Sequence, residues 1–185
     1  MAEHNRLVTI IFMLVACISS AVASETVNFQ HLSLNSMFPQ ITINGLYQDE
    51  SGVLWIGTKD GVKKYNGNYI ESVNFMGINN WIQSNLVPTI CGDKKGHLYV
   101  NTDYSIIEYD LIKEESRIIF SQPNTQILPS IAFNYGINSL WIGLLDSVYN
   151  YKEGICQAKY KIDSNNLSIS SLKEASDKML YIGTK

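Results

Sequence analysis

Residues 48–65 read QDESGVLWIGTKDGVKKY and contain two aromatic residues, Trp55 and Tyr65, ten positions apart. The same interval recurs in two further pairs, Tyr99 with Tyr109 and Trp141 with Tyr151. The leading aromatics of the three pairs are spaced 44 and 42 residues apart. A repeat of about 40–45 residues built from short strands is typical of the blades of a β-propeller.

A fourth repeat begins at Tyr181, which follows the third leading aromatic after 40 residues. We place the repeats near residues 41–75, 87–121, 129–162 and 169–185. They predict an all-β domain over residues 24–185, in which each blade is a four-stranded antiparallel sheet. Because a propeller closes with about four to eight blades, we expect an incomplete propeller of about three and a half blades from the N-terminal part of a longer protein.

Turn-forming residues divide the first repeat into four strands. The expected strands are 43–47, 54–58, 62–65 and 69–75, with turns at 49–52, 59–61 and 66–68. Glycine tolerates the positive φ of a tight turn, and an Asp carboxylate accepts hydrogen bonds from its own turn. We therefore expect Asp49 and Asp93 to close the first turn of their repeats, with Asn134 near the same place in the third. Calcium binding is the alternative role, but these acids do not cluster as in a calcium loop.

The repeated aromatic and glycine residues predict close packing between blades. A large flat side chain fills the wedge between two twisted sheets, so we expect the aromatics to lie between neighbouring blades. Gly57, Gly143 and Gly183 each come two residues after an aromatic. At these positions we expect an adjacent sheet to come so close that a Cβ atom would clash. The second repeat has Asn101 instead of glycine.

The composition suits a globular domain and gives no indication of nucleic-acid binding. The chain has 185 residues, 17% of them charged, and a formal net charge of −3 at pH 7. Its 14 Lys and Arg residues are scattered, and the densest basic spots are pairs of lysines. No basic stripe is therefore available to hold phosphates.

Residues 1–23 have the pattern of an export signal peptide. An apolar run from residue 7 to 18 is followed by Ala21-Val22-Ala23, an A-x-A cleavage site. The run is shorter than the roughly 20 apolar residues that span a bilayer. In an alternative interpretation, residues 14–17 (LVAC) resemble a lipobox, and Cys17 would carry a lipid. Either way, we expect the rest of the chain outside the cytoplasm.

Cysteine and histidine residues do not indicate a catalytic, cofactor or metal site. After removal of the signal, Cys91 and Cys156 remain, in strands of different blades. We expect two half-buried free thiols, with a disulfide as the alternative in an exported protein. His31 and His97 are isolated, and no Cys/His cluster has the spacing of metal ligands.

The stretch 48–65 resembles the two-component regulator propeller repeat, in which a Gln-Asp-x-x-Gly turn precedes Leu-Trp-Ile-Gly-Thr and a Gly-Leu-aromatic strand. The later repeats match this pattern in part. The resemblance implies the sensor region of a hybrid two-component histidine kinase and response regulator, on the periplasmic side of the inner membrane of a Gram-negative gut bacterium. Such proteins continue into a second propeller, a β-sandwich, a membrane helix, a kinase core, a receiver domain and a DNA-binding domain.

The same resemblance implies an oligosaccharide ligand and a homodimer of the complete sensor. Sugars stack on aromatic faces and hydrogen-bond to polar side chains. Asn79, Asn80 and Trp81, between the first two repeats, are therefore candidate ligand-binding residues, and Tyr104, in a turn, is a further candidate. The alternative for Trp81 is that it packs against a blade.

Two other functions remain open for a propeller of this kind. One is a scaffold for protein–protein contact or dimerisation. The other is a carbohydrate-active enzyme, which needs paired carboxylates that face a binding channel. Since the repeated acids occupy expected turns, we predict no enzymatic activity, catalytic residue or cofactor for this chain.

Overall fold

A computed structural model describes residues 42–75, 86–121, 129–162, 168–175 and 179–185, which form fourteen strands and no helix. The predicted all-β class is therefore confirmed for this part of the chain. The chain divides into two units, 1–39 and 40–185, and the described residues belong to the second. The signal peptide and residues 79–81 lie outside the described residues. No helix suited to crossing a membrane occurs among the residues that the structure describes.

The strands form three four-stranded sheets and one two-stranded sheet, all antiparallel. The first sheet contains β1 (Ile43–Gln48), β2 (Leu54–Thr58), β3 (Gly61–Tyr65) and β4 (Ile70–Val73). The second contains β5 (Thr89–Gly92), β6 (His97–Asn101), β7 (Ser105–Asp110) and β8 (Glu115–Ser121). The third contains β9 (Ser130–Asn134), β10 (Ser139–Leu144), β11 (Ser147–Lys152) and β12 (Ile155–Lys161), and the two-stranded sheet contains β13 (Ile169–Glu174) and β14 (Leu180–Thr184).

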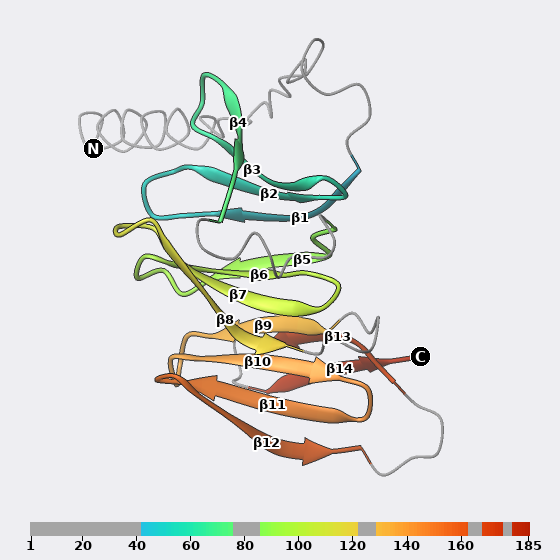
Figure 1. Cartoon of the computed structure of the whole chain (residues 1–185). Coiled ribbons are helices and arrows are strands. Elements are labelled where there is room, and N and C mark those ends of the chain that lie inside the picture. Colours follow the sequence, from blue (N-terminus) through green and yellow to red (C-terminus); the bar gives the residue numbers. More distant parts are fainter. Residues whose placement is uncertain (1–41, 76–85, 122–128, 163–167, 176–178) are drawn as a thin grey trace, which may run out of the picture. The chain divides into compact units, whose positions relative to one another are not determined.

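Within each sheet, neighbouring strands follow the order of the sequence and are joined by hairpins. Consecutive sheets meet through their first strands, since β1 contacts β5, β5 contacts β9 and β9 contacts β13. Figure 1 shows the sheets succeeding one another, with β4, β8 and β12 at the opposite edges of their sheets. Four-stranded meanders in this arrangement are propeller blades, as the repeats predicted.

Polar side chains close the first turn of the three four-stranded sheets, as expected. Asp49 Oδ1 accepts hydrogen bonds from the backbone N–H groups two and four residues later, at 2.9 and 3.0 Å. Asp93 Oδ1 accepts the equivalent pair at 2.7 and 3.0 Å. Asn134 Oδ1 accepts from the N–H three residues later, at 3.0 Å. The repeated Asp and Asn residues therefore shape the turns.

The ten-residue interval places its two aromatics on opposite faces of one sheet. Trp55 in β2 lies opposite Lys64 in β3, and Tyr65 lies opposite Leu54. Residues directly opposite each other share a face, and successive residues of a strand point to opposite faces. The second and third sheets repeat this register, with Leu98 opposite Tyr109 and Leu140 opposite Tyr151.

The leading aromatic of one sheet consequently meets the trailing tyrosine of the next. The rings of Trp55 and Tyr109 contact each other edge to face, with centroids 6.1 Å apart. Tyr99 and Tyr151 belong to the core cluster between the second and third sheets. The expectation that the repeated aromatics pack between blades is confirmed for these four residues. It is wrong for Tyr181 in β14, which is 56% exposed.

The indole N–H groups of two equivalent tryptophans have different surroundings. Trp55 Nε1 donates to Asp49 Oδ2 at 2.8 Å. Burial raises the pKa of Asp49, but its hydrogen bonds outweigh this effect and lower the pKa below its usual value. Trp141 Nε1 is buried and has no hydrogen-bond partner among the described residues. In the third sheet the equivalent turn is closed by Asn134. Its side-chain amide stands where Asp49 provides the carboxylate that accepts from the indole of Trp55.

Close approach of the next sheet explains two of the three repeated glycines. A Cβ atom on Gly57 would lie 2.8 Å from Val87 Cγ1, just before β5. A Cβ atom on Gly143 would lie 2.6 Å from Ile169 Cγ2 in β13. The interpretation is wrong for Gly183, where the nearest atom is the hydroxyl of Ser171 in the neighbouring strand of the same sheet.

The two cysteines of the described region are free, as expected. Burial raises the pKa of the Cys91 thiol to about 12, which keeps this thiol protonated. Cys156 in β12 is exposed, so the expectation that it is half-buried is wrong.

Replacing Trp55 by Phe should destabilise the fold more than the same change at Trp141. The first change removes the donor to Oδ2 of the buried Asp49 carboxylate, whereas the second removes an N–H that has no partner among the described residues. We expect a difference of about 1 kcal/mol or more in the free energy of unfolding, measured by urea denaturation. Equal losses in the two variants would contradict this assignment.

The change Gly143→Ala should cost about 1–3 kcal/mol of unfolding free energy, because the added methyl overpacks the contact with β13. Gly183→Ala is the matched control, since the Ser171 hydroxyl can rotate away from the added methyl. Thermal and chemical unfolding of both variants measure the effect. A control that is as unstable as Gly143→Ala would show that inter-sheet contact is not the cause.

Candidate functional site

A row of three polar side chains crosses the second sheet on the face toward the third. Tyr99 in β6 lies opposite Glu108 in β7, which lies opposite Arg117 in β8. The equivalent rows are Trp55, Lys64 and Glu71 in the first sheet and Trp141, Asn150 and Gln157 in the third. Lys64 and Glu71 form an ion pair at 2.8 Å. The second sheet therefore carries the same kind of pair with the charges exchanged.

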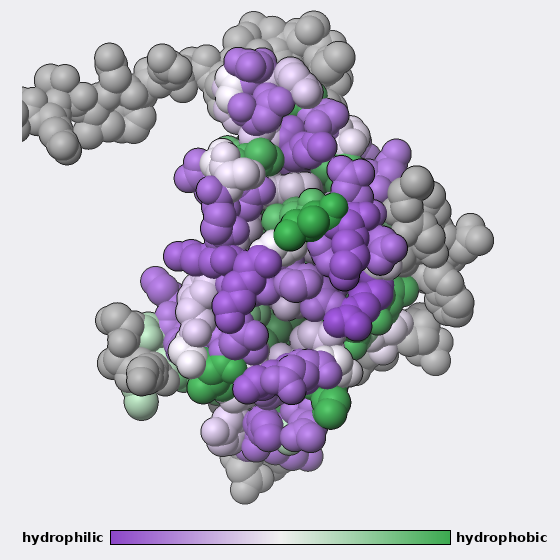
Figure 2. Space-filling view, turned by 90° about the vertical axis from the view of Figure 1, so that its left-hand side faces the viewer, coloured by the Kyte–Doolittle hydropathy of each residue, from purple (hydrophilic) through white to green (hydrophobic). Residues whose placement is uncertain are grey.

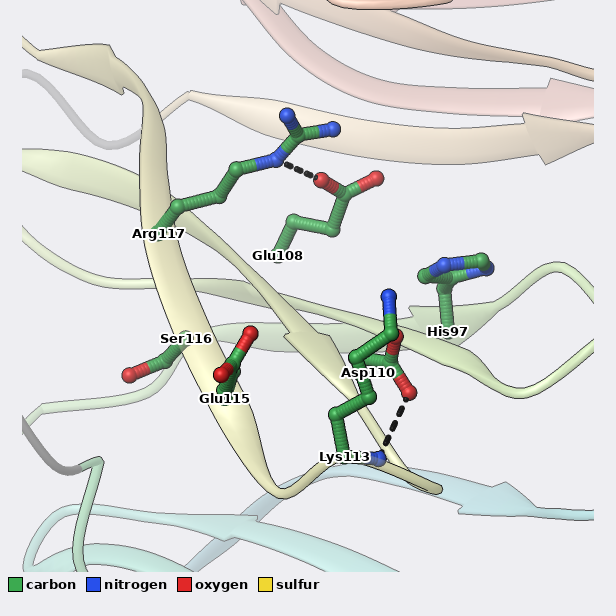
Figure 3. Close-up of a pocket in the computed structure, with 7 residues that line it drawn as sticks. All are labelled: His97, Glu108, Asp110, Lys113, Glu115, Ser116 and Arg117. Atoms are coloured by element: carbon green, nitrogen blue, oxygen red, sulfur yellow. Dashed lines mark hydrogen bonds and ion pairs between the residues drawn. The ribbon is translucent and has the colours of Figure 1, made fainter.

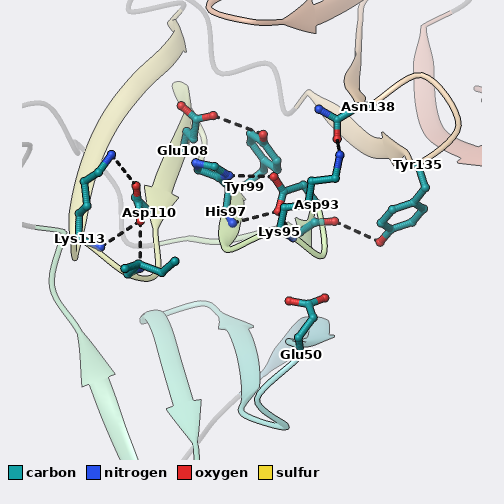
Figure 4. Close-up of polar contacts among 12 residues, drawn as sticks. Glu50, Asp93, Lys95, His97, Tyr99, Glu108, Asp110, Lys113, Tyr135 and Asn138 are labelled. Carbon is teal, nitrogen blue, oxygen red and sulfur yellow. Dashed lines mark hydrogen bonds and ion pairs between the residues drawn. The ribbon is translucent and has the colours of Figure 1, made fainter.

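Glu108 is the centre of the row, and its side chain is only 10% exposed. Arg117 Nε donates to its carboxylate in an ion pair, and the Tyr99 hydroxyl donates at 3.3 Å. The Tyr151 hydroxyl of the third sheet donates at 3.4 Å and also accepts from Arg117 Nη2 at 3.0 Å. Figures 3 and 4 show Glu108 with Arg117 and with Tyr99, respectively. The carboxylate thus joins two sheets.

Charge and burial act together on the groups around Glu108. Burial raises the pKa of Tyr99 and of Tyr151, and the negative charge of Glu108 raises both further. The hydrogen bond to Glu108 raises the pKa of Arg117. Both tyrosines therefore remain hydrogen-bond donors at neutral pH.

A contact between a carboxylate and an imidazole lies beside this row. His97 Nδ1 lies 2.8 Å from Asp93 Oδ2. In the first sheet the equivalent carboxylate oxygen accepts from the indole of Trp55. The leading aromatic of the second sheet is Tyr99, which has no ring N–H, so Asp93 binds the imidazole of His97 instead (Figure 4).

Asp110 is a further acid beside Glu108 and Asp93, and it is the last residue of β7. Its carboxylate accepts from the backbone N–H of Lys113 at 3.0 Å and forms an ion pair with the ammonium group of the same residue at 3.1 Å. These bonds hold the pKa of Asp110 at about 2. Asp110 therefore stays ionised at every physiological pH.

These groups border a cavity of about 260 Å³, drawn in Figure 3. Its lining residues are His97, Glu108, Asp110, Lys113, Glu115, Ser116 and Arg117. The lining combines carboxylates with imidazole, guanidinium and hydroxyl donors, which suits a small ligand that both donates and accepts hydrogen bonds. Within the described ranges, no three His, Cys, Asp or Glu residues are arranged to hold a metal ion.

A larger cavity of about 500 Å³ lies between the first and second sheets. Buried Trp55 and Tyr109 form part of its apolar lining, together with Leu111. Glu50, Lys64 and Glu114 add charged groups to the lining. The face of the molecule in Figure 2 is mostly hydrophilic, with small separate hydrophobic patches. The larger cavity therefore combines apolar and charged groups.

Of the candidates named from sequence, the structure describes only Tyr104. Tyr104 is half-buried in the β6–β7 turn, where its N–H lies 3.4 Å from Thr102 Oγ1. Asn79, Asn80 and Trp81 lie outside the described residues. The sequence analysis missed Glu108 and Arg117. One signal was available, because Glu108 is a charged residue inside the apolar run of β7.

The family comparison agrees with the resemblance drawn from the repeat. Residues 37–60 match the model of the two component regulator propeller family. This match includes the turn at Asp49 and the strand that contains Trp55. No curated protein sequence matches the chain.

Solved structures with a similar fold include two extracellular domains from B. thetaiotaomicron. The first, assigned to a one-component system, has a TM-score of 0.66 and 18% identity, over 81% of this chain and 21% of that one. The second, assigned to a hybrid two-component system, has a TM-score of 0.62 and 18% identity, over 85% and 22%. This chain therefore spans about a fifth of the length of those domains.

Virginiamycin B lyase from Staphylococcus aureus, an enzyme, is also similar in structure. Its TM-score is 0.61 at 15% identity, over 76% of this chain and 48% of the lyase. At identities this low, the similarities show a common propeller fold and leave the activity to be argued from the site.

Replacing Glu108 by Ala should lower the free energy of unfolding by about 1–3 kcal/mol, because three donors lose a buried acceptor. Arg117→Ala should cost less than about 1 kcal/mol, since the side chain of Arg117 is 63% exposed and its charge is screened by water. Urea denaturation of both variants measures the difference. If Glu108→Ala were as stable as the parent chain, Glu108 would not join the sheets.

Proposed function

We propose that this chain is the extracytoplasmic sensor region of a two-component signalling protein, and that it binds an oligosaccharide. The observation that supports this most is the match of residues 37–60 to the two component regulator propeller family, inside a chain folded into successive blades. The signal is relayed to a histidine kinase that belongs to the rest of the protein. The extracellular domains with the same fold are consistent with this role.

The chemistry of the two cavities supports an oligosaccharide as the ligand. The larger one combines apolar side chains such as Leu111 with carboxylates, and the smaller one is lined by polar side chains. Hydroxyl groups both donate and accept, so they can bind carboxylates and guanidinium groups in the same cavity. The two cavities therefore suit short stretches of glycan.

Export, membrane attachment and dimerisation complete the proposal. The signal peptide delivers the domain to the periplasm of a Gram-negative bacterium. Attachment to the membrane comes from other parts of the protein or, in the alternative, from a lipid on Cys17. The complete sensor acts as a homodimer, and a scaffold for protein–protein contact is the alternative role for the same blades.

One observation favours an enzyme as a second candidate function. The Asp93–His97 pair borders a cavity that also contains Glu108 and Asp110. A carboxylate that holds an imidazole is the arrangement of a general base. Incubation with each oligosaccharide followed by chromatography of the products tests this candidate, and unchanged sugars would remove it.

Isothermal titration of the full chain with cello-, xylo-, malto- and laminari-hexaose, and with heparin- and chondroitin-derived hexasaccharides, tests the proposed ligand. We expect heat from at least one of these glycans and none from an uncharged polyethylene glycol of similar length. Saturable binding to one glycan supports the sensor. Absence of heat with every glycan would contradict oligosaccharide binding and favour the scaffold.

A further inference from the structure

The β7–β8 turn of the second sheet borders both cavities described above. Of the residues from 110 to 115, those that line the smaller cavity are Asp110, Lys113 and Glu115 (Figure 3). Those that line the larger cavity are Leu111, Ile112 and Glu114. Neighbouring residues of one short segment therefore border different cavities. The segment 110–115 forms a wall between the two cavities.

The wall continues into the beginning of β6. Gly96 lines the larger cavity, and the next residue, His97, lines the smaller one. The Leu111 N–H donates to the Gly96 carbonyl at 2.8 Å, which fixes the turn to this point of the second sheet. A Cβ atom on Gly96 would lie 3.5 Å from Ile112 Cδ1, so the Ile112 side chain lies against Gly96. The two cavities therefore lie on either side of one hydrogen-bonded stretch of backbone.

The composition of this turn differs from that of its counterparts. Turns are usually built of Gly, Asn, Asp, Pro and Ser. The equivalent turns are 66–69 (NGNY) in the first sheet and 153–154 (EG) in the third, whereas the second sheet has Leu111 and Ile112. Ile112 is 84% exposed. Single exposed apolar residues are common, but this one lies on the wall between two cavities, where it can contact a ligand that enters both.

Two adjacent glutamates place one carboxylate in each cavity. Glu114 lines the larger cavity and Glu115 the smaller one, and both residues are exposed. A carboxylate accepts hydrogen bonds from sugar hydroxyls, and bonds to a charged group are stronger than bonds between neutral groups. A single oligosaccharide can bind both glutamates from inside the two cavities only if its chain passes over the turn.

We propose that the two cavities form one binding site for a single oligosaccharide, whose chain crosses the β7–β8 turn, and this inference rests on the proposed function. Sugar units on one side of the turn bind Glu115 in the smaller cavity, and units on the other side bind Glu114 in the larger one. The unit between them contacts the exposed side chain of Ile112. The site therefore selects glycans by length, because a short glycan fills one cavity only.

Titration with glycans of increasing length measures this selection. The full chain is titrated with the hexasaccharide of the panel that binds it most tightly, and with the disaccharide, trisaccharide and tetrasaccharide of the same series. We expect the affinity to rise by about a hundredfold or more from the disaccharide to the hexasaccharide, because binding in the second cavity becomes intramolecular. An affinity that is already maximal for the disaccharide would overturn the inference.

Substitutions on the two sides of the wall test each cavity separately. Glu114→Ala and Glu115→Ala should each weaken binding of the hexasaccharide by about tenfold or more, the size of one lost hydrogen bond to a charged group. Ile112→Ser should weaken it by about fourfold or more, the size of one buried methylene group, and leave disaccharide binding unchanged.

Glu153→Ala is the matched control, because Glu153 lies in the equivalent turn of the third sheet and lines neither cavity. Its φ of 51° is close to the 56° of Glu114, so both changes put alanine into the same backbone conformation. The control should leave the affinity unchanged. Loss of affinity in only one of the two cavities would overturn the inference while the proposed function stands. If the parent chain bound no glycan at all, the proposed function would fail and the inference with it.

Discussion

The contact between the leading aromatic of one sheet and the trailing tyrosine of the next determines the rest of the structure. The register puts these two residues on opposite faces of their own sheet, so each sheet offers one ring to each neighbour. Trp55 meets Tyr109 across the first contact, and Tyr99 and Tyr151 share the cluster at the second. The ten-residue spacing therefore gives each sheet one ring for each of its neighbours. The contacts between these rings form only when two repeats pack together.

Because the blades repeat, each position in one blade can be compared with the equivalent positions in the others. Positions that serve the stacking of sheets recur between blades, as Gly57 and Gly143 do in the first and third sheets. The second sheet departs from its neighbours at both ends of its strands, with the Asp93–His97 pair at one end and Asp103 at the other. These departures bury or pair polar and charged groups, which costs free energy.

The sequence predicted much of the fold because the repeats are local and periodic. Turn residues gave the strand boundaries to within about two residues, and Asp49 and Asp93 close the expected turns. The face that each aromatic occupies could not be predicted, because it depends on the register of a hairpin pairing. The same applies to Gly183, whose surroundings depend on the partner of its strand.

The candidate site was harder to predict than the fold. Glu108, Arg117 and Tyr151 come from two sheets, and their contact depends on how those sheets pack. Tyr104 was named as a candidate from the sequence because it replaces an acid in a repeated turn. The burial of its neighbour Asp103 was not predicted, since burial of a turn residue leaves no mark in the sequence. Comparing repeats position by position was the informative signal, and it works only where the blades differ.

A double-mutant cycle between Trp55 and Tyr109 tests the stacking rule most directly. The residues are 54 positions apart in sequence and in contact across two sheets, whereas Trp55 and Tyr65 share one sheet on opposite faces. With leucine at each position, urea denaturation should give a coupling energy of about 0.5–1.5 kcal/mol for Trp55 with Tyr109. For Trp55 with Tyr65 the coupling should be within about 0.5 kcal/mol of zero. Strong coupling inside the sheet and none between the sheets would contradict the account.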